Sequence, residues 1–329
     1  MVHPLFDITG RKAIVTGGTR GLGHGMAEGL MEAGCEVVII GSSARVHTAA
    51  EEFRARGFAC HSVQADLGRR EECYRAFGEA VEQLGGDLDI IVTAHGIQRR
   101  HRADQFPMSD WDDVIRVNLE SQFILCQEAS KIMVKKGYGK IITISSMASF
   151  FGGQNVVAYS AAKGGVAQMT KCMSNDLLAC GVNVNSIAPG YFATDMNEAL
   201  LDPSNYRYKE ICDRIPAHRW GEPADMKRVP VPCVACERLS GRRDPAGRRR
   251  LPLQVRGACS GAFHYQKDPQ GWLPWGSFSV PMRQAPATRW SSASRARCSA
   301  ARQPSCMARR RDRTSSICPH VSAIWDCAP

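Results

Sequence analysis

Six short runs rich in β-branched residues recur along the first 227 residues, separated by longer stretches of mixed polarity. The runs are KAIVT, EVVII, HSVQA, LDIIVT, GKIITIS and NVNSIA. Runs of this length are typical of buried strands, and the stretches between them are long enough for helices. Such alternation favours a parallel sheet covered by helices on both faces, so the pattern predicts a doubly wound α/β fold.

Helical periodicity supports this interpretation. Apolar residues recur at helical spacing after the first run, at Leu22, Met26, Leu30 and Ala33. Ser109 precedes a second helical stretch, WDDVIRVNLESQFILCQEASKIM, as a helix start. A final helix-strand unit begins near Asp195, and its strand is not found in the sequence that follows. We therefore expect a Rossmann-like sheet that lacks its last strand.

The composition changes abruptly after Lys227. Residues 228–329 hold 17 Arg and one Lys against five acidic residues, a net charge of +13, whereas residues 1–227 carry −3. The same segment holds 11 of the 17 prolines but only two isoleucines, which does not favour a packed core. We expect one domain over residues 1–227 and a disordered or irregular Arg-, Pro- and Cys-rich tail.

The positive charge and the cysteines of the tail suggest two binding functions, but the spacing of these residues supports neither. Its charge could attract nucleic acid, but the arginines are not interleaved with lysines or aromatic residues at a regular interval. Cys233 and Cys236 have the spacing of half a zinc site, but no second pair follows at ligand spacing, so we expect no metal.

Targeting and membrane signals are also lacking. The chain has no apolar stretch of about 18 residues, and its first residues do not resemble a secretion signal. We therefore expect a cytoplasmic protein with no membrane contact.

A glycine-rich turn, TGGTRGLG, joins the first predicted strand to the first helix. Gly17, Gly21 and Gly23 allow a tight turn and a close approach to a pyrophosphate, which the free N–H groups of a helix N-terminus attract. Taken alone, a glycine-rich turn of this kind often binds no ligand. The flanking strand and helix indicate a nucleotide site.

YSAAK places Tyr159 and Lys163 on one face of a predicted helix. A neighbouring ammonium and a cationic nicotinamide ring would both stabilise a phenolate, and so allow proton exchange near neutral pH. Ser146 ends the fifth predicted strand, where α/β sheets bind ligands, and its hydroxyl could hold a substrate oxygen. Taken singly, these residues are equally compatible with a surface pair and a helix cap.

Together these motifs resemble the short-chain dehydrogenase/reductase family over residues 5–227, with its Asn-Ser-Tyr-Lys tetrad matched by Asn118, Ser146, Tyr159 and Lys163. The resemblance implies that Tyr159 is the general acid/base and that Lys163 lowers its pKa and binds the nicotinamide ribose. It implies that Ser146 orients the carbonyl or hydroxyl, and that Asn118 anchors a water of a proton relay.

The resemblance also implies NAD or NADP as the cofactor and a set of cofactor contacts. Asp66 resembles the adenine-binding aspartate, and Thr194 the carboxamide-binding threonine. The full set is Gly17, Thr19, Arg20, Gly21, Leu22, Gly23, Ser42, Asp66, Leu67, Gly96, Tyr159, Lys163, Pro189, Gly190 and Thr194.

Two positions depart from the family pattern. The sequence Thr-Ala-His-Gly, residues 93–96, stands where the family has Asn-Asn-Ala-Gly, and we interpret His95 as a local substitution rather than a catalytic base. Gly41 stands where the family often has an acid that binds the ribose of NAD. Without that carboxylate a 2′-phosphate is not repelled, and Arg20 or Arg45 could pair with it, so both cofactors remain open.

Several stretches narrow the resemblance to sugar-acid dehydrogenases: GLGHGMAEGLMEAGC, GIQRRHRADQFPMSDWDDV, SMASFFGG, NVNSIAPGYFATDMNEAL and DRIPAHRWGEPAD. They are similar to the 2-deoxy-D-gluconate 3-dehydrogenase (2-dehydro-3-deoxy-D-gluconate 5-dehydrogenase) subfamily, and TDMNEAL leans toward gluconate 5-dehydrogenases. A 3-oxoacyl-reductase-like enzyme is an alternative. We expect Arg99 or Arg100 to bind the substrate carboxylate and Gln154 to contact the substrate. Two solvated arginines are the alternative.

The end of the chain suggests a changed reading frame near Lys227. Chains of this family continue with a Phe-Leu-Ala-Ser run and end near Val-Asp-Gly-Gly. A displacement of one base lets residues 231–235 and 246–252 encode similar runs. Such a chain would lack part of the surface of the family's homo-oligomer, usually a tetramer, and an inactive truncated chain is then an alternative. The DNA sequence across the Lys227 codon would show whether the reading frame changes there.

Overall fold

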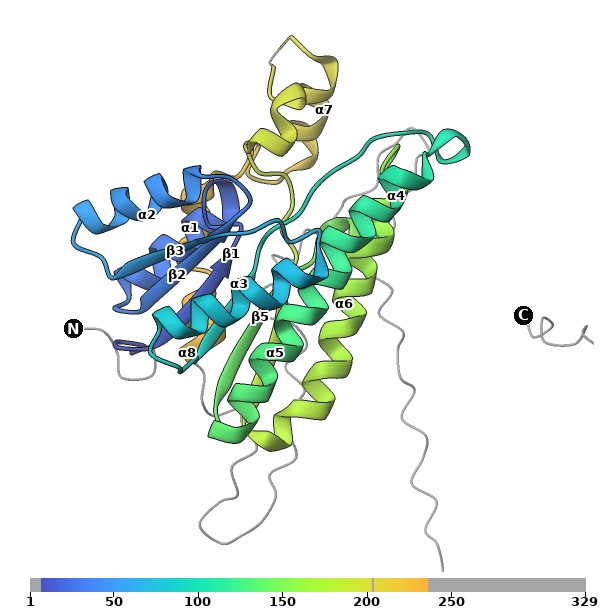
Figure 1. Cartoon of the computed structure of the whole chain (residues 1–329). Helices are drawn as coiled ribbons and strands as arrows, with labels where there is room; N and C mark the ends of the chain where they lie inside the picture. Colours follow the sequence, from blue (N-terminus) through green and yellow to red (C-terminus); the bar gives the residue numbers. More distant parts are fainter. Residues whose placement is uncertain (1–6, 203, 236–329) are drawn as a thin grey trace, which may run out of the picture. The chain divides into compact units, whose positions relative to one another are not determined.

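The computed structural model describes residues 7–202 and 204–235, and the predicted tail lies outside this part apart from its first eight residues (Figure 1). Six strands form one parallel sheet in the order β3-β2-β1-β4-β5-β6. Their bounds are Lys12–Thr16 (β1), Glu36–Gly41 (β2), Cys60–Gln64 (β3), Ile90–Thr93 (β4), Gly139–Ile144 (β5) and Val182–Ile187 (β6). The prediction of a doubly wound parallel sheet is confirmed.

Helices cover both faces of the sheet (Figure 1). On one face lie α1 (Gly21–Glu32) and α2 (Arg45–Ala55), and on the other α3 (Arg70–Gln83), α5 (Ser121–Lys136) and α6 (Val157–Leu177). Successive strand residues point to opposite faces, so Val15 packs under α1 and Ile14 under α3. The inner strands β1, β2, β4 and β5 are buried on both faces and are therefore nearly continuous apolar runs, whereas the outer strands β3 and β6 include polar, partly exposed residues.

Shorter elements complete the described part. The remaining helices are α4 (Met108–Ile115), α7 (Tyr206–Arg214) and α8 (Pro230–Ala235), the π-helix η3 (Arg116–Glu120), and the 3₁₀ helices η2 (Ala103–Gln105), η4 (Met147–Ser149), η5 (Leu178–Cys180), η6 (Asp195–Leu200) and η7 (Pro223–Met226). Within the described residues, no helix is both long and apolar enough to cross a bilayer.

Strand register brings the carboxyl ends of three strands together. Thr16, the last residue of β1, lies opposite Ile40 of β2 and Thr93 of β4. The strand order reverses between β1 and β4, since β2 follows on one side and β4 on the other. In open α/β sheets a ligand crevice opens at such a switch point, outside the carboxyl ends of the strands.

The segment around Lys227 packs directly on α1. A Cβ atom at Gly25 would overlap the carbonyl oxygen of Pro223, and one at Gly29 would overlap that of Lys227. Glycine at both positions therefore allows backbone to lie on backbone. Val229 and Cys233 still pack against the core, so ordered packing continues six residues past the predicted domain boundary.

Candidate active site

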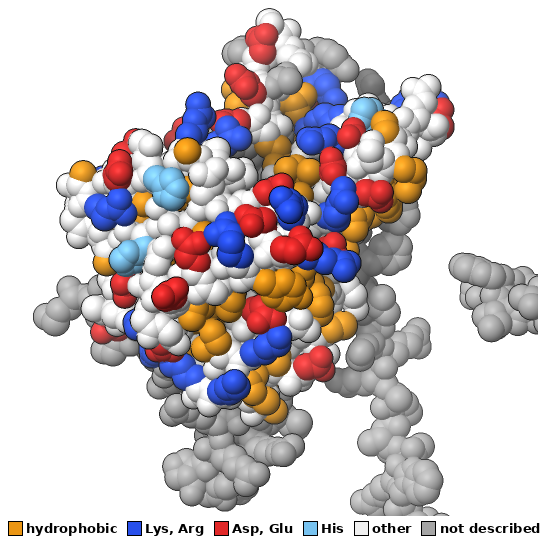
Figure 2. Space-filling model, in the orientation of Figure 1, with side chains coloured by type: hydrophobic (Ala, Val, Ile, Leu, Met, Phe, Trp, Pro, Cys, Tyr) orange, Lys and Arg blue, Asp and Glu red, His pale blue; other side chains and the backbone are white. Residues whose placement is uncertain are grey.

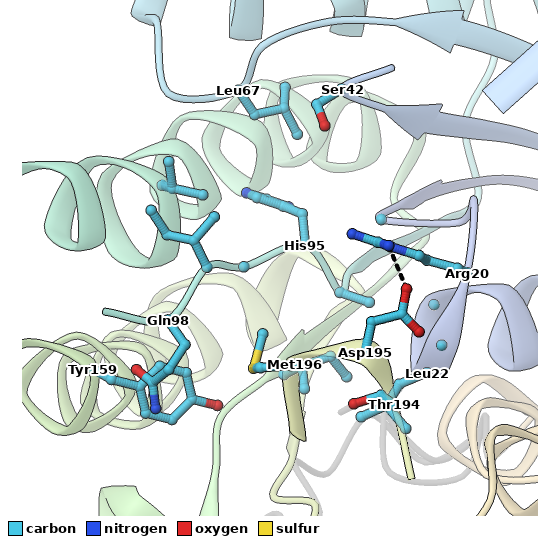
Figure 3. A pocket seen from close by; sticks show the side chains of 18 of the residues that line it. Arg20, Leu22, Ser42, Leu67, His95, Gln98, Tyr159, Thr194, Asp195 and Met196 are labelled. Carbon is cyan, nitrogen blue, oxygen red and sulfur yellow. Dashed lines mark hydrogen bonds and ion pairs between the residues drawn. The ribbon is translucent and has the colours of Figure 1, made fainter. Parts of the chain in front are cut away.

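One cavity of about 1300 Å³ runs along the carboxyl ends of the strands, from the glycine-rich turn to the first turn of α6 (Figure 3). It is lined by every residue of the predicted cofactor set, and by Ser146, Arg99 and Arg100. Asn118 lies behind its wall, whereas Gln154 is exposed and does not line it. The structure thus brings together all but one of the predicted site residues.

The glycine-rich turn has the backbone that its sequence predicts. Gly17 and Gly21 adopt positive φ angles of 67° and 61°, and a Cβ at Gly23 would overlap the carbonyl oxygen of Gly17. Arg20 is the N-cap of α1 but makes no side-chain cap, and the first turn carries no acidic residue. The helix N-terminus is therefore free to bind an anion, which fits the pyrophosphate of a dinucleotide.

The end of β2 forms the next part of the cavity. A Cβ at Gly41 would overlap the hydroxyl oxygen of Thr19, so a carboxylate here would require the Thr19 side chain to move. Ser42 and Arg45 line the cavity instead. Arg20 reaches across the opening and pairs with Asp195, the first residue of η6 (Figure 3). These residues fit either NAD or NADP.

Tyr159 points into the cavity from the first turn of α6 (Figure 3). Burial raises the pKa of its phenol, and a hydrogen bond with Ser146 and the positive charge of Arg100 partly offset this rise in pKa. Ser146 is the N-cap of η4, and its oxygen accepts the N–H of Ala148 at 3.1 Å. Because that bond uses the oxygen as an acceptor, the hydroxyl hydrogen is available to the phenol.

Lys163 lies one helical turn after Tyr159 and is 4% exposed. Its Nζ donates to the carbonyl oxygen of Ile144 at 2.7 Å and lies 5.8 Å from the centroid of the Tyr159 ring. Burial lowers the pKa of this ammonium to about 8. A cation at this position favours the ionised form of the phenol.

Asn118 lies in the π-helix η3, fully buried beside the end of β4. Its amide nitrogen donates to the carbonyl oxygen of Ile97 and its amide oxygen accepts the N–H of Ile97, both at 2.8 Å. A Cβ at Gly96 would lie 3.1 Å from the same amide oxygen. Asn118 thus fixes the backbone of residues 96–97, which forms one wall of the cavity.

The two arginines expected to bind substrate differ in their surroundings. Arg99 lies 3.6 Å from Asp110, whose other oxygen bonds to Nε2 of His101 at 2.6 Å. Arg100 is exposed, and among the described residues it makes no ion pair. Its charge nevertheless reaches the Tyr159 phenol, whose pKa it lowers.

Sequence reasoning missed several lining residues. Gln98 lies in the wall, and its buried amide oxygen has no partner among the described residues. Its place beside Arg99 in the GIQRR stretch was the available signal, as was the position of Asp195 directly after Thr194. Asp110 had no such signal, because only the fold brings α4 to the cavity.

Comparison with known proteins agrees with this geometry. The family model for short chain dehydrogenases matches residues 11–205. The 2-dehydro-3-deoxy-D-gluconate 5-dehydrogenase of Escherichia coli is 42% identical over 69% of this chain and 88% of its own length. The gluconate 5-dehydrogenase of Gluconobacter oxydans is 36% identical over 69% and 88%.

A solved structure extends the comparison. The gluconate 5-dehydrogenase of Burkholderia cenocepacia, in complex with NADP and tartrate, is similar with a TM-score of 0.67 and 36% identity. The match covers 72% of this chain and 93% of that one. The chain therefore belongs to the short-chain dehydrogenase family and is an NAD(P)-dependent oxidoreductase.

Proposed function

We propose that this protein is a sugar-acid dehydrogenase that interconverts a hydroxyl and a carbonyl on a substrate of the 2-deoxygluconate, 2-dehydro-3-deoxygluconate or gluconate type. The names of the similar proteins support this substrate class. The observation that carries the proposal is Arg100, a cation without a carboxylate partner among the described residues, which acts on the same cavity and the same phenol. A substrate carboxylate would supply that partner.

In the proposed reaction, the nicotinamide ring supplies or accepts the hydride when the cofactor is bound. Tyr159 takes the proton from the substrate hydroxyl during oxidation and returns it during reduction. Ser146 holds the same substrate oxygen through its hydroxyl. The Lys163 ammonium lowers the pKa of the phenol, and Asn118 keeps the wall at Ile97 in place and anchors a water of the proton relay.

The function is tested by assaying the purified full-length chain against gluconate, 2-deoxygluconate and their keto forms with NAD and NADP. We expect reversible absorbance change at 340 nm with at least one sugar acid and weaker turnover of the corresponding neutral sugars. Turnover of a 3-oxoacyl thioester without any sugar-acid activity would contradict the proposal. Binding of NADPH without turnover of any substrate would favour the inactive alternative.

The two arginines give the sharpest test of carboxylate binding. Arg100→Ala should raise KM for the sugar acid by about 10- to 100-fold, because a charge-assisted contact contributes roughly 1.5–3 kcal/mol. Arg99→Ala is the matched control and should change KM less, since Asp110 already neutralises that guanidinium. Steady-state KM values of the two variants show which arginine binds the carboxylate. An Arg99 effect larger than that of Arg100 would reverse the assignment.

We also propose a homo-oligomer in the cytoplasm. Phe123 and Val134 lie three turns apart on one side of α5 and are 43% and 38% exposed. Apolar side chains gather on the surface in this region (Figure 2), as expected of an interface. Cys35, Cys60, Cys73 and Cys126 of the described part are buried free thiols, which suits a reducing compartment.

We further propose that the dehydrogenase domain ends at the boundary predicted near Lys227, with a short packed extension, and that the tail is the product of a changed reading frame. The packing of Val229 and Cys233 on the core supports an intact domain up to this point.

A further inference from the structure

His95 lies buried at the end of β4, between the glycine-rich turn and the first residue of α5. Its Nδ1 lies 2.6 Å from the hydroxyl oxygen of Thr16, and its Nε2 lies 2.6 Å from the hydroxyl oxygen of Ser121. Thr16 ends β1 and Ser121 begins α5. One imidazole ring therefore joins three elements of the fold.

The remaining hydrogen bonds fix the direction of this chain. The Ser121 hydroxyl donates to the carbonyl oxygen of Val117 at 2.7 Å, so its oxygen must accept from Nε2–H of His95. Nδ1 is then the acceptor of the Thr16 hydroxyl hydrogen, since the other acceptor of that hydroxyl, the carbonyl oxygen of Val92, is at 3.4 Å whereas Nδ1 is at 2.6 Å. The Thr16 oxygen in turn accepts the N–H of Ala94 at 3.1 Å. Every group is satisfied by a neutral ring with its hydrogen on Nε2.

Burial keeps the ring in that neutral form. Burial and, to a smaller extent, the positive charge of Lys163 lower the pKa of His95 to about 3, while a hydrogen bond to the backbone of Val117 acts in the other direction. A ring that stays neutral over the working pH range does not carry the reaction's proton.

The ring also lies where the two halves of the cavity wall meet. A Cβ at Gly17 would come within 2.9 Å of the backbone N and Cα of His95, so the turn rests on the His95 backbone. Two residues further on, Ile97 is held by both ends of the Asn118 amide. His95 thus connects the turn at Gly17 with the wall at Asn118.

We propose that His95 is a positioning residue, which holds the glycine-rich turn in register with the start of α5 and so sets the distance between the two parts of the cavity that bind the cofactor. This inference rests on the proposed cofactor roles of Gly17 and of Gly96, which lies against Asn118. It does not depend on which substrate the enzyme uses.

The first test is nuclear magnetic resonance of the full chain with ¹⁵N-labelled histidine and no cofactor. The His95 signals are identified by their loss in His95→Leu. We expect Nδ1 in the unprotonated range and Nε2 in the protonated range, with no titration between about pH 5 and pH 9. Titration in that window, or a hydrogen on Nδ1, would overturn the assignment of the ring.

The second test measures cofactor affinity and turnover separately. His95→Leu should weaken NADPH binding by about 10-fold, and Thr16→Val and Ser121→Ala, which each remove one of the two bonds, should each weaken it by a smaller factor. His95→Gln, which can still donate or accept, should recover part of the loss. The pH profile of kcat should keep its ionisations in all four variants.

The matched control is Thr143→Val, which removes a buried hydroxyl that bonds to Thr170 at 2.7 Å away from the cavity. It should destabilise the protein without changing NADPH affinity. Unchanged affinity in His95→Leu and in both single-bond variants, or loss of an ionisation from the pH profile, refutes the positioning role. A chain that binds NADPH with these shifts but oxidises no sugar acid refutes only the proposed substrate class.

Discussion

Tyr159→Phe should lower kcat by about 10³-fold while leaving KM for the cofactor within about threefold of the native value. Positioned general acid/base groups contribute roughly 10²- to 10⁴-fold to rate, and this substitution removes the phenol's proton but keeps its ring. The ring is packed beside Val114 and Ala158, so the fold should be retained. Steady-state kinetics with thermal unfolding of the same samples would measure both quantities.

Tyr74→Phe provides the control for this experiment. Tyr74 is 49% exposed on α3, outside the cavity, so the same atom is removed where no proton is transferred. Its kinetics should match those of the native chain. If Tyr159→Phe retained more than about a tenth of native kcat, the phenol could not be the group that moves the proton.

The inner strands were predictable because they are buried on both faces and therefore carry nearly continuous apolar runs. The predicted run EVVII matches β2 (Glu36–Gly41) to within one residue, since its burial and its β-branched composition coincide. The glycine-rich turn predicted a strand before it and a helix after it, but the strand order that creates the switch point came only from the structure. Local sequence therefore predicted most of the strands and helices, and the glycine-rich turn that lines the cavity.

The helix expected after Ser109 shows where sequence periodicity fails. It is continuous in the pattern, but the structure interrupts it with the π-helix Arg116–Glu120, which contains Asn118. A π-helix adds one residue to a turn, and a single extra residue does not disturb an apolar pattern enough to be seen. Its effect is to turn Asn118 toward Ile97, a contact between residues 21 positions apart.

The roles of the arginines depend on packing rather than on local pattern. Arg99 and Arg100 are adjacent and identical in sequence terms, and only the approach of Asp110 from α4 distinguishes them. The loop position of Gln154 likewise gave no indication that its side chain would be exposed outside the cavity. Long-range contacts of this kind require the folded chain.

Lys163→Met should abolish most activity and at the same time stabilise the protein. The ammonium is buried, and its pKa of about 8 lies below the ordinary value of 10.5. At pH 7 the native chain therefore bears a cost of about 3 kcal/mol for keeping the group charged, by the relation of about 1.4 kcal/mol per pKa unit. The lost hydrogen bond from the charged ammonium to the buried carbonyl of Ile144 offsets roughly 1.5–3 kcal/mol of the gain, which leaves a net increase of up to about 1.5 kcal/mol in unfolding free energy.

The difference in unfolding free energy between Lys163→Met and the native chain should depend on pH. Between about pH 8 and pH 10.5 the unfolded native chain binds a proton at Lys163 that the folded chain has lost, so native stability rises with pH in that window. Lys163→Met has no such group, so its advantage should be largest below pH 8 and should shrink as the pH approaches 10.5. Denaturant unfolding at pH 7, 9 and 10.5 measures the difference.

Lys171→Met, on the same helix but exposed beside Gln168, is the matched control and should change neither stability nor kcat. For Lys163→Met we expect kcat to fall by about 10²-fold or more, because the variant lacks the buried cation that we propose favours the ionised phenol. A variant that is less stable than the native chain at pH 7, or a stability difference that does not vary with pH, would show that the buried ammonium bears no desolvation cost. Stability gained together with activity lost is the behaviour expected of a charge that is buried for its chemistry.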